Sequence, residues 1–149
     1  MTDLNDFTEL GVLDHGLCVI STTRADGSVQ SSVVNAGAMD HPVTGDQVVA
    51  LVAAGGSAKL AHLRRDPRTT IVLRAGWQWV GVEGTAEIVG PDDGYPGIDA
   101  EALRILLRDV FTAAGGTHDD WDDYDRTMAD DRRAAVLITP TRIYGVRPG

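Results

Sequence analysis

The residues best suited to chemistry are a serine and a lysine that follow two glycines, in the stretch GGSAKLAHLRRDPR from Gly55 to Arg68. A glycine-rich turn that opens a helix directs free backbone N–H groups outward, and a nearby cation completes an anion site. Ser57, Ala58 and Lys59 are therefore the expected ligands of an anionic group. The alternative is a surface helix whose arginines pair with carboxylates elsewhere in the chain.

The charge around this turn is opposite in sign to that of the whole chain. Between Ser57 and Arg74 five cations stand against one acid, whereas the 149 residues carry a net charge of −9. Twelve of the 22 acidic residues fall between Asp92 and Asp131. A surface this acidic repels nucleic acid and anionic lipid, so we expect neither as a partner. An anionic ligand should instead be drawn to the basic segment around Lys59.

Two further pairs of residues are candidates for a binding site. Gln30 and Ser32 share one side of an expected strand, because side chains alternate with a period of two. Trp77 and Trp79 share a face of a later strand and can stack on a flat ring, although core or interface packing also explains such a pair. Together with the turn at Lys59 they describe a cleft for a flat ring with a phosphate tail. Such a cofactor carries the chemistry itself, and the protein binds and orients it.

Other kinds of site find no support in the sequence. The four histidines are scattered without the spacing of metal ligands, and no nucleophile elbow or nucleotide-binding glycine motif is present, so neither a metal nor a catalytic residue is assigned. The aspartates after His118 predict a helix start rather than a calcium loop. Cys18, the one cysteine, lies in the apolar run LCVI and is expected to be buried and inert in a reducing, cytoplasmic compartment. No apolar run is long enough to span a membrane, and the acidic N-terminus is unlike a signal peptide.

The pattern along the chain predicts a mostly β protein, an antiparallel barrel of about six strands with three to four helices in a single domain of residues 1–149. A DG step between two β-type runs is a strong hairpin signal, and Gly81 and Gly84 are expected bulge points in a long strand. The expected helices cover residues 6–15, 57–65, 98–113 and 121–133. The expected strands cover residues 17–24, 28–34, 69–73, 77–89 and 134–146, with a further hairpin from 37 to 52.

The segments AKLAHLRRDPR, VEGTAEI and WDDYDRTMADDRR, with the closing RIYGVRPG, resemble the pyridoxamine-phosphate-oxidase-like split β-barrel family over nearly the whole chain. Within that family the chain is most similar to the small reductases that use the deazaflavin coenzyme F420. The resemblance implies a homodimer with two cofactor sites at the subunit interface. Where this branch often has a bulky basic or proline-containing pair before Ala58, this chain has Gly56-Ser57, which implies one phosphate cation fewer.

The resemblance also implies roles for the candidate residues. The turn at Ser57, Ala58 and Lys59 would hold the cofactor phosphate. Gln30 and Ser32 would lie near the ring and ribityl chain, with Trp77 or Trp79 beside it. Arg132 would reach over from the other subunit.

The function that the resemblance implies is hydride transfer from reduced F420 to an electron-poor unsaturated small molecule. Two alternatives remain open at this point. One is an FMN-dependent oxidase or flavin reductase of the pyridoxamine-phosphate-oxidase type. The other is a binding module without catalysis, either an F420 carrier or a heme-utilisation-like barrel, and fold alone does not choose among them.

Overall fold

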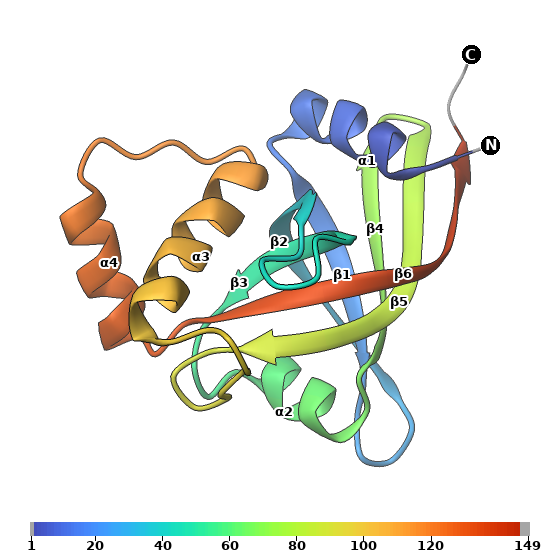
Figure 1. Ribbon diagram of the computed structural model, residues 1–149. Coiled ribbons are helices and arrows are strands. Elements are labelled where there is room, and N and C mark those ends of the chain that lie inside the picture. The colour runs from blue at the N-terminus through green and yellow to red at the C-terminus, as the bar shows by residue number, and fades with distance from the viewer. Residues whose placement is uncertain (1, 147–149) are drawn as a thin grey trace.

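A computed structural model describes residues 2–146, and its six antiparallel strands close a barrel in the order β1-β2-β3-β6-β5-β4 (Figure 1). The predicted fold class is therefore confirmed. Residues 1 and 147–149 of the predicted domain lie outside the described residues. The strands are β1 (Leu17–Thr23), β2 (Val29–Asp40), β3 (Gln47–Ala53), β4 (Arg68–Ala75), β5 (Gln78–Val89) and β6 (Ala134–Val146). The helices are α1 (Leu4–Gly11), with a 3-10 turn after it (Val12–Asp14), α2 (Ala58–Arg65), α3 (Ala100–Ala113) and α4 (Trp121–Asp130).

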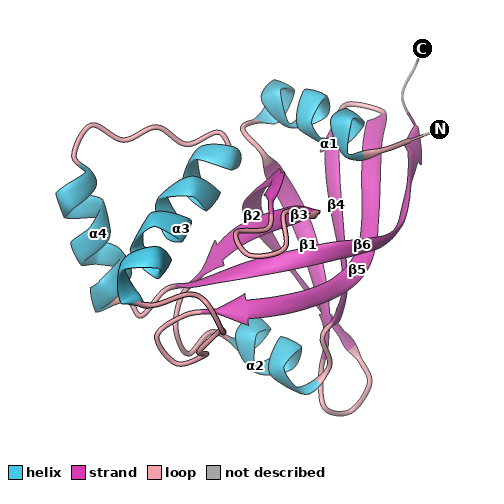
Figure 2. Ribbon diagram, in the orientation of Figure 1, coloured by secondary structure: helices cyan, strands magenta, loops and turns pink. Residues whose placement is uncertain are grey.

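The barrel interior is filled by the inward side chains of all six strands, and a helix contributes apolar side chains at each end (Figure 2). Phe7 and Leu10 of α1 enter this core from one end, and Leu60 and Leu63 of α2 enter it from the other. Cys18 is buried as predicted, and burial raises the pKa of its thiol to about 12. The thiol is therefore protonated and unreactive at neutral pH.

Local chemistry fixes the turns and helix starts in the way the sequence predicts. In the β1–β2 turn the Asp26 carboxylate accepts a bond of 2.9 Å from the backbone N–H of Ser28, and Gly27 takes a left-handed conformation. The aspartates after His118 do start a helix, because Asp120 caps α4 through the N–H of Asp123 at 3.1 Å.

The barrel is only partly closed between β2 and β3. Their ladder joins Ala36–Asp40 of β2 to Gln47–Leu51 of β3. The preceding part of β2, residues 29–35, pairs with β1 alone. The end of β3, beyond Leu51, pairs with β6 instead. The barrel is therefore split along one side, at the level where β3 leads into α2.

Helix α3 packs against the outside of β2, β3 and β6, and α4 packs against α3, so that the two helices form a layer beside the barrel (Figure 1). A second apolar core fills the space between them, with Val48 and Ala50 of β3 packed against the inner face of α3. At the C-terminal end of α3 the contact is between main chains. A Cβ atom at Gly37 of β2 would collide with the carbonyl group of Ala113, so only glycine fits there.

The observed elements depart from the expected ones at several places, among them the first helix, which was expected over residues 6–15 and spans Leu4–Gly11. The two segments expected on either side of residue 35 form one continuous strand, β2. The strand expected from Trp77 begins at Gln78, which leaves Trp77 in the β4–β5 turn. The helix expected to end at residue 133 ends at Asp130, and α3 begins two residues later than expected. The predicted irregularity at Gly84 is confirmed by a register shift between Glu83 and Gly84. No helix in residues 2–146 is long and apolar enough to cross a membrane.

Replacing Gly37 by alanine is expected to lower the free energy of unfolding by about 1–3 kcal/mol, because the new methyl group must displace the Ala113 carbonyl. Urea unfolding followed by circular dichroism measures the change. Gly94→Ala is the matched control, since a Cβ atom there meets nothing within 4 Å. Equal stability of the two variants would show that the α3 layer is free to move away from β2.

Candidate functional site

A cleft of about 410 Å³ lies at the split of the barrel, between its wall and the helical layer. Its lining comes from β2, from the end of β3 with the turn into α2, and from α3 and α4. The lining residues are Val33, Val34, Asn35, Val52, Ala53, Ala54, Ser57, Lys59, Val110, Phe111, Ala114, Tyr124, Met128 and Arg133.

The charges that line this cleft are both positive. Lys59 and Arg133 contribute them, and the lining contains no carboxylate, although the chain as a whole carries −9. Within residues 2–146, Lys59 forms no ion pair. Arg133 reaches a single oxygen of the exposed Asp131 at 3.2 Å. The cleft therefore favours an anionic ligand.

The turn that leads into α2 carries polar groups in need of a partner. Ser57 occupies the N-cap position, but its side chain makes no capping bond, and its buried Oγ has no hydrogen-bond partner among the described residues. A buried hydroxyl without a partner is costly. The N–H groups of the first helical turn, including those of Ala58 and Lys59, also have no helical acceptor. A phosphate oxygen at this turn would satisfy both kinds of group, so the residues fit the predicted role.

The arginines that follow Lys59 are engaged elsewhere. Arg64 forms a two-bond ion pair with Asp93, at 2.6 and 2.9 Å. Arg68 pairs with Asp66, and its hydrogen bonds lower the pKa of that carboxyl group to about 2. For these two residues the structure agrees with the alternative stated from sequence, a surface helix whose arginines pair with carboxylates. Among the five cations of the basic segment, Lys59 is the one that lines the cleft.

Gln30 and Ser32 lie on the part of β2 that pairs with β1 alone. Ser32 is opposite Ile20 in the register, so the two candidates share one side of the strand, as predicted. Both are half-buried, and neither lines the cleft, which takes Val33, Val34 and Asn35 from the same strand.

The two tryptophans lie far from the turn at Lys59 within one chain. Trp77 is 93% exposed in the β4–β5 turn, beside α1 and at the end of the barrel away from α2 (Figure 1). Trp79 is half-buried on β5, where its ring meets Tyr144 edge-on with centroids 5.9 Å apart. Neither tryptophan lines the cleft.

Arg132 also lies outside the cleft. Its backbone is left-handed, with φ of 49°, and its guanidinium pairs with Asp92 of the same chain. Its neighbour Arg133 lines the cleft instead, a residue that the sequence analysis missed. The sequence shows an arginine pair at the end of a helix, but the left-handed residue that sends the two side chains apart is visible only in the structure.

The aromatic wall of the cleft was missed as well. Phe111 and Tyr124 lie with ring centroids 5.1 Å apart, where α3 and α4 meet. The Tyr124 hydroxyl donates to the carbonyl oxygen of Leu107 at 2.8 Å, and burial raises its pKa to about 12. The apolar periodicity of residues 98–113 was the available signal, and it marked a buried helix face without showing what that face covers.

The fold defines a class of small antiparallel barrels, and the cleft at the split carries two cations and no carboxylate. A family model described as Pyridoxamine 5'-phosphate oxidase matches residues 5–147, and the chain belongs to this family. The predicted family is therefore confirmed.

Several solved structures share the fold. A conserved hypothetical protein from Mycobacterium tuberculosis is similar with a TM-score of 0.68 and 22% identity, over 97% of this chain and 84% of the other. A protein described as an F420 reductase is similar with a TM-score of 0.60 and 14% identity, over 91% and 94%. A pyridoxamine 5'-phosphate oxidase-related, FMN-binding protein from Nostoc punctiforme has a TM-score of 0.65 and 11% identity, over 95% and 79%.

Tyr124→Phe is expected to lower the free energy of unfolding by about 1 kcal/mol at pH 7, because it removes the bond to the Leu107 carbonyl. The raised pKa of Tyr124 means that the folded chain keeps a proton that the unfolded chain loses between about pH 10 and 12. Stability therefore falls with rising pH in that range. Urea unfolding at pH 8, 10 and 11 should show a shallower fall for the variant than for the parent. Parallel curves would contradict the assignment of this proton to Tyr124.

Proposed function

We propose that the protein is a coenzyme F420-dependent reductase that passes a hydride to an electron-poor unsaturated small molecule. The observation that carries the proposal is the cleft at the split, which combines two cations, no carboxylate and a buried, unpartnered serine hydroxyl. Membership of the oxidoreductase family named above supports it.

In this proposal the cofactor phosphate lies at the turn into α2. Lys59 binds it through charge, and Ser57 Oγ and the first-turn N–H groups donate hydrogen bonds to it. Val33 and Phe111 give the cleft apolar walls against the flat part of the molecule. When bound, the reduced coenzyme supplies a hydride from C5 of its ring system.

The work left to the protein is binding, orientation and exclusion of water. The cleft lining holds no histidine, aspartate or glutamate, and the Tyr124 hydroxyl is engaged with the Leu107 carbonyl. We therefore assign no proton donor among the lining residues and take the proton from solvent. The rate should then depend on how the cleft orients the two reactants.

F420 is preferred over FMN because its oligoglutamate tail adds negative charges beyond the phosphate. Those charges gain from the two cations of the cleft, Lys59 and Arg133, in an interaction that salt weakens. FMN is the second candidate, since its phosphate fits the same turn and an FMN-binding protein shares the fold. A carrier without turnover is the third.

A titration with F420 and, in parallel, FMN tests the choice, with fluorescence followed at 50 and 500 mM NaCl. F420 should bind more tightly and lose more affinity with salt. Lys59→Ala should weaken F420 binding at least about tenfold, since a hydrogen bond to a charged group contributes about 1.5–3 kcal/mol. Arg68→Ala is the matched control, because Arg68 is already paired with Asp66, and it should change affinity less than twofold.

Three outcomes would count against the proposal. Unchanged F420 affinity in Lys59→Ala would move the site away from this turn. Tighter binding of FMN, or a protein that purifies yellow with oxidised flavin, would favour the FMN enzyme. Tight F420 binding without oxidation of the reduced coenzyme by quinones or conjugated carbonyl compounds would favour a carrier.

We also propose that the protein is a homodimer whose second copy completes the site. On the outer face of the barrel Val19 and Val33 are direct cross-strand neighbours, and they are 42% and 68% exposed. Val29 continues this apolar stripe with 60% exposure. Contact between two copies along this stripe would cover the apolar surface. It would also allow Trp77, Trp79 and Arg132 to approach the partner's cleft, since they do not line the cleft of their own chain.

Val19→Asp should convert a dimer, with twice the 15.9 kDa mass of one chain, into a monomer, because the contact would bury an unpaired charge. Size-exclusion chromatography with light scattering measures the mass. Val43→Asp is the control, since Val43 is 50% exposed in the β2–β3 turn, outside the stripe, and it should leave the dimer intact. A monomeric parent protein, or a dimer that persists in Val19→Asp, would exclude this interface.

A further inference from the structure

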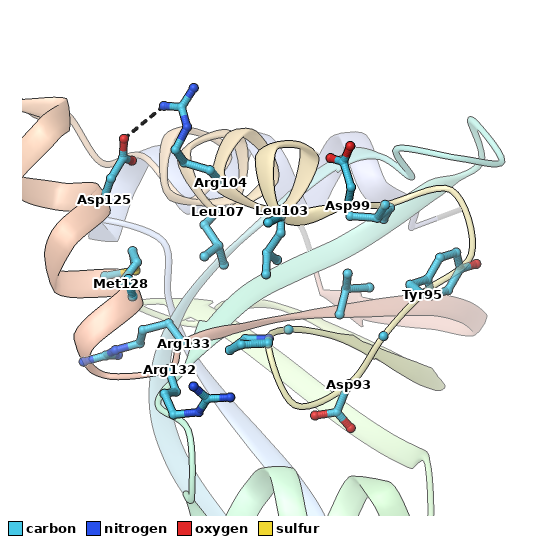
Figure 3. Close-up of a pocket in the computed structure, with 17 residues that line it drawn as sticks. Asp93, Tyr95, Asp99, Leu103, Arg104, Leu107, Asp125, Met128, Arg132 and Arg133 are labelled. Carbon is cyan, nitrogen blue, oxygen red and sulfur yellow. Dashed lines mark hydrogen bonds and ion pairs between the residues drawn. The ribbon is translucent and has the colours of Figure 1, made fainter.

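A second cavity, of about 520 Å³, lies between α3, α4 and the loop of residues 90–98 (Figure 3). Its walls are mainly apolar, from Val89, Tyr95, Ile98, Leu103, Leu107 and Met128. Its volume falls within the usual range of small-molecule sites, about 300–1,000 Å³.

Most of the charged groups around this cavity form ion pairs, either with one another or with charges just outside it. Asp125 accepts hydrogen bonds from Arg104, at 3.0 Å, and from Arg108. Arg132 pairs with Asp92, and Asp93 pairs with Arg64.

The last rim carboxylate, Asp99, accepts the backbone N–H of Ala102 at 2.8 Å as the cap of α3. An ion that entered this cavity would have to break existing pairs. The cleft differs, because it offers Lys59 without an ion pair among the described residues.

The Tyr95 ring, which forms part of the cavity wall, is held in place by groups on the side of the ring that faces away from the cavity. The Tyr95 hydroxyl points away from Leu103 and Leu107 (Figure 3) and lies 3.4 Å from Nε2 of the buried His41. That imidazole is itself fixed, since Nε2 donates to Glu87 at 3.1 Å and Nδ1 accepts from the backbone of the β2–β3 turn. The ring therefore presents a preformed apolar face to a ligand.

We infer that this cavity is a second binding site, for a neutral and mainly apolar small molecule. It shares only Met128 and Arg133 with the cleft, so these two side chains form the wall between the sites. Apolar walls, together with rim charges that are mostly engaged with other groups, favour an uncharged molecule that gains by leaving water. The inference stands independently of the cofactor proposed for the cleft.

Titration with the uncharged dye Nile red tests the inference, because its fluorescence rises in apolar surroundings. We expect saturable binding of one dye per chain, unchanged between 50 and 500 mM NaCl. Ala129→Trp places an indole at the cavity wall, away from the cleft lining, and should weaken binding at least tenfold. Ile105→Trp is the matched control, on an exposed position of α3 outside both cavities, and should change the affinity less than twofold.

Circular dichroism establishes that each variant is folded. Gly94→Phe serves as a second blocking variant, because Gly94 lines the cavity and a Cβ atom there meets nothing within 4 Å. Loss of binding in the blocking variants alone supports the site. Absence of saturable binding would overturn the inference, as would equal binding in all variants, which would place the dye on the exposed apolar surface or in the cleft. Stronger, salt-sensitive binding of the anionic dye anilinonaphthalene sulfonate at this cavity would overturn its neutral character.

Discussion

The incomplete pairing of β2 with β3 is the constraint on which the rest of the structure depends. Five residue pairs close the barrel there, and residues 29–35 of β2 keep one edge without a neighbouring strand of the same chain. A free strand edge exposes unpaired backbone N–H and C=O groups, so it has to be covered or paired with another segment. The gap beside it admits the turn into α2 and the side chains of α3 and α4, and the cleft is the space that remains between them.

The two cavities differ in the charges that line them. Around both cavities several arginines form ion pairs with carboxylates, such as Arg64 with Asp93. The electrostatic potential inside a cavity then depends on the lining groups that have no ion-pair or hydrogen-bond partner. Lys59 and the Ser57 hydroxyl are such groups at the cleft, while the α3–α4 cavity, bounded by paired charges, offers mainly shape and apolar surface.

The sequence was informative where chemistry is local. Alternation, the DG turn and the capping aspartates identified the strands and helices, and the consecutive residues 57–59 had to share one turn. Residues distant in sequence were harder to place. Register decides that Trp77 ends up at the barrel end opposite α2, and a single left-handed residue decides that Arg133 rather than Arg132 reaches the cleft. The aromatic wall from α3 and α4 depends on how two helices cross, which periodicity does not encode.

The contact of Gly37 with Ala113 bears on how such a site diversifies over evolutionary time. The helical layer meets β2 there through main-chain atoms, so its distance from the barrel does not depend on side-chain volume at that point. Substitutions at a nearby cleft position such as Val33, which belongs to neither core, can then alter the polarity and shape of the lining while the helix stays in place. Because this wall of the cleft is positioned by main-chain contact, single substitutions in the lining can change which ligand fits. The second core does not have to repack when they occur.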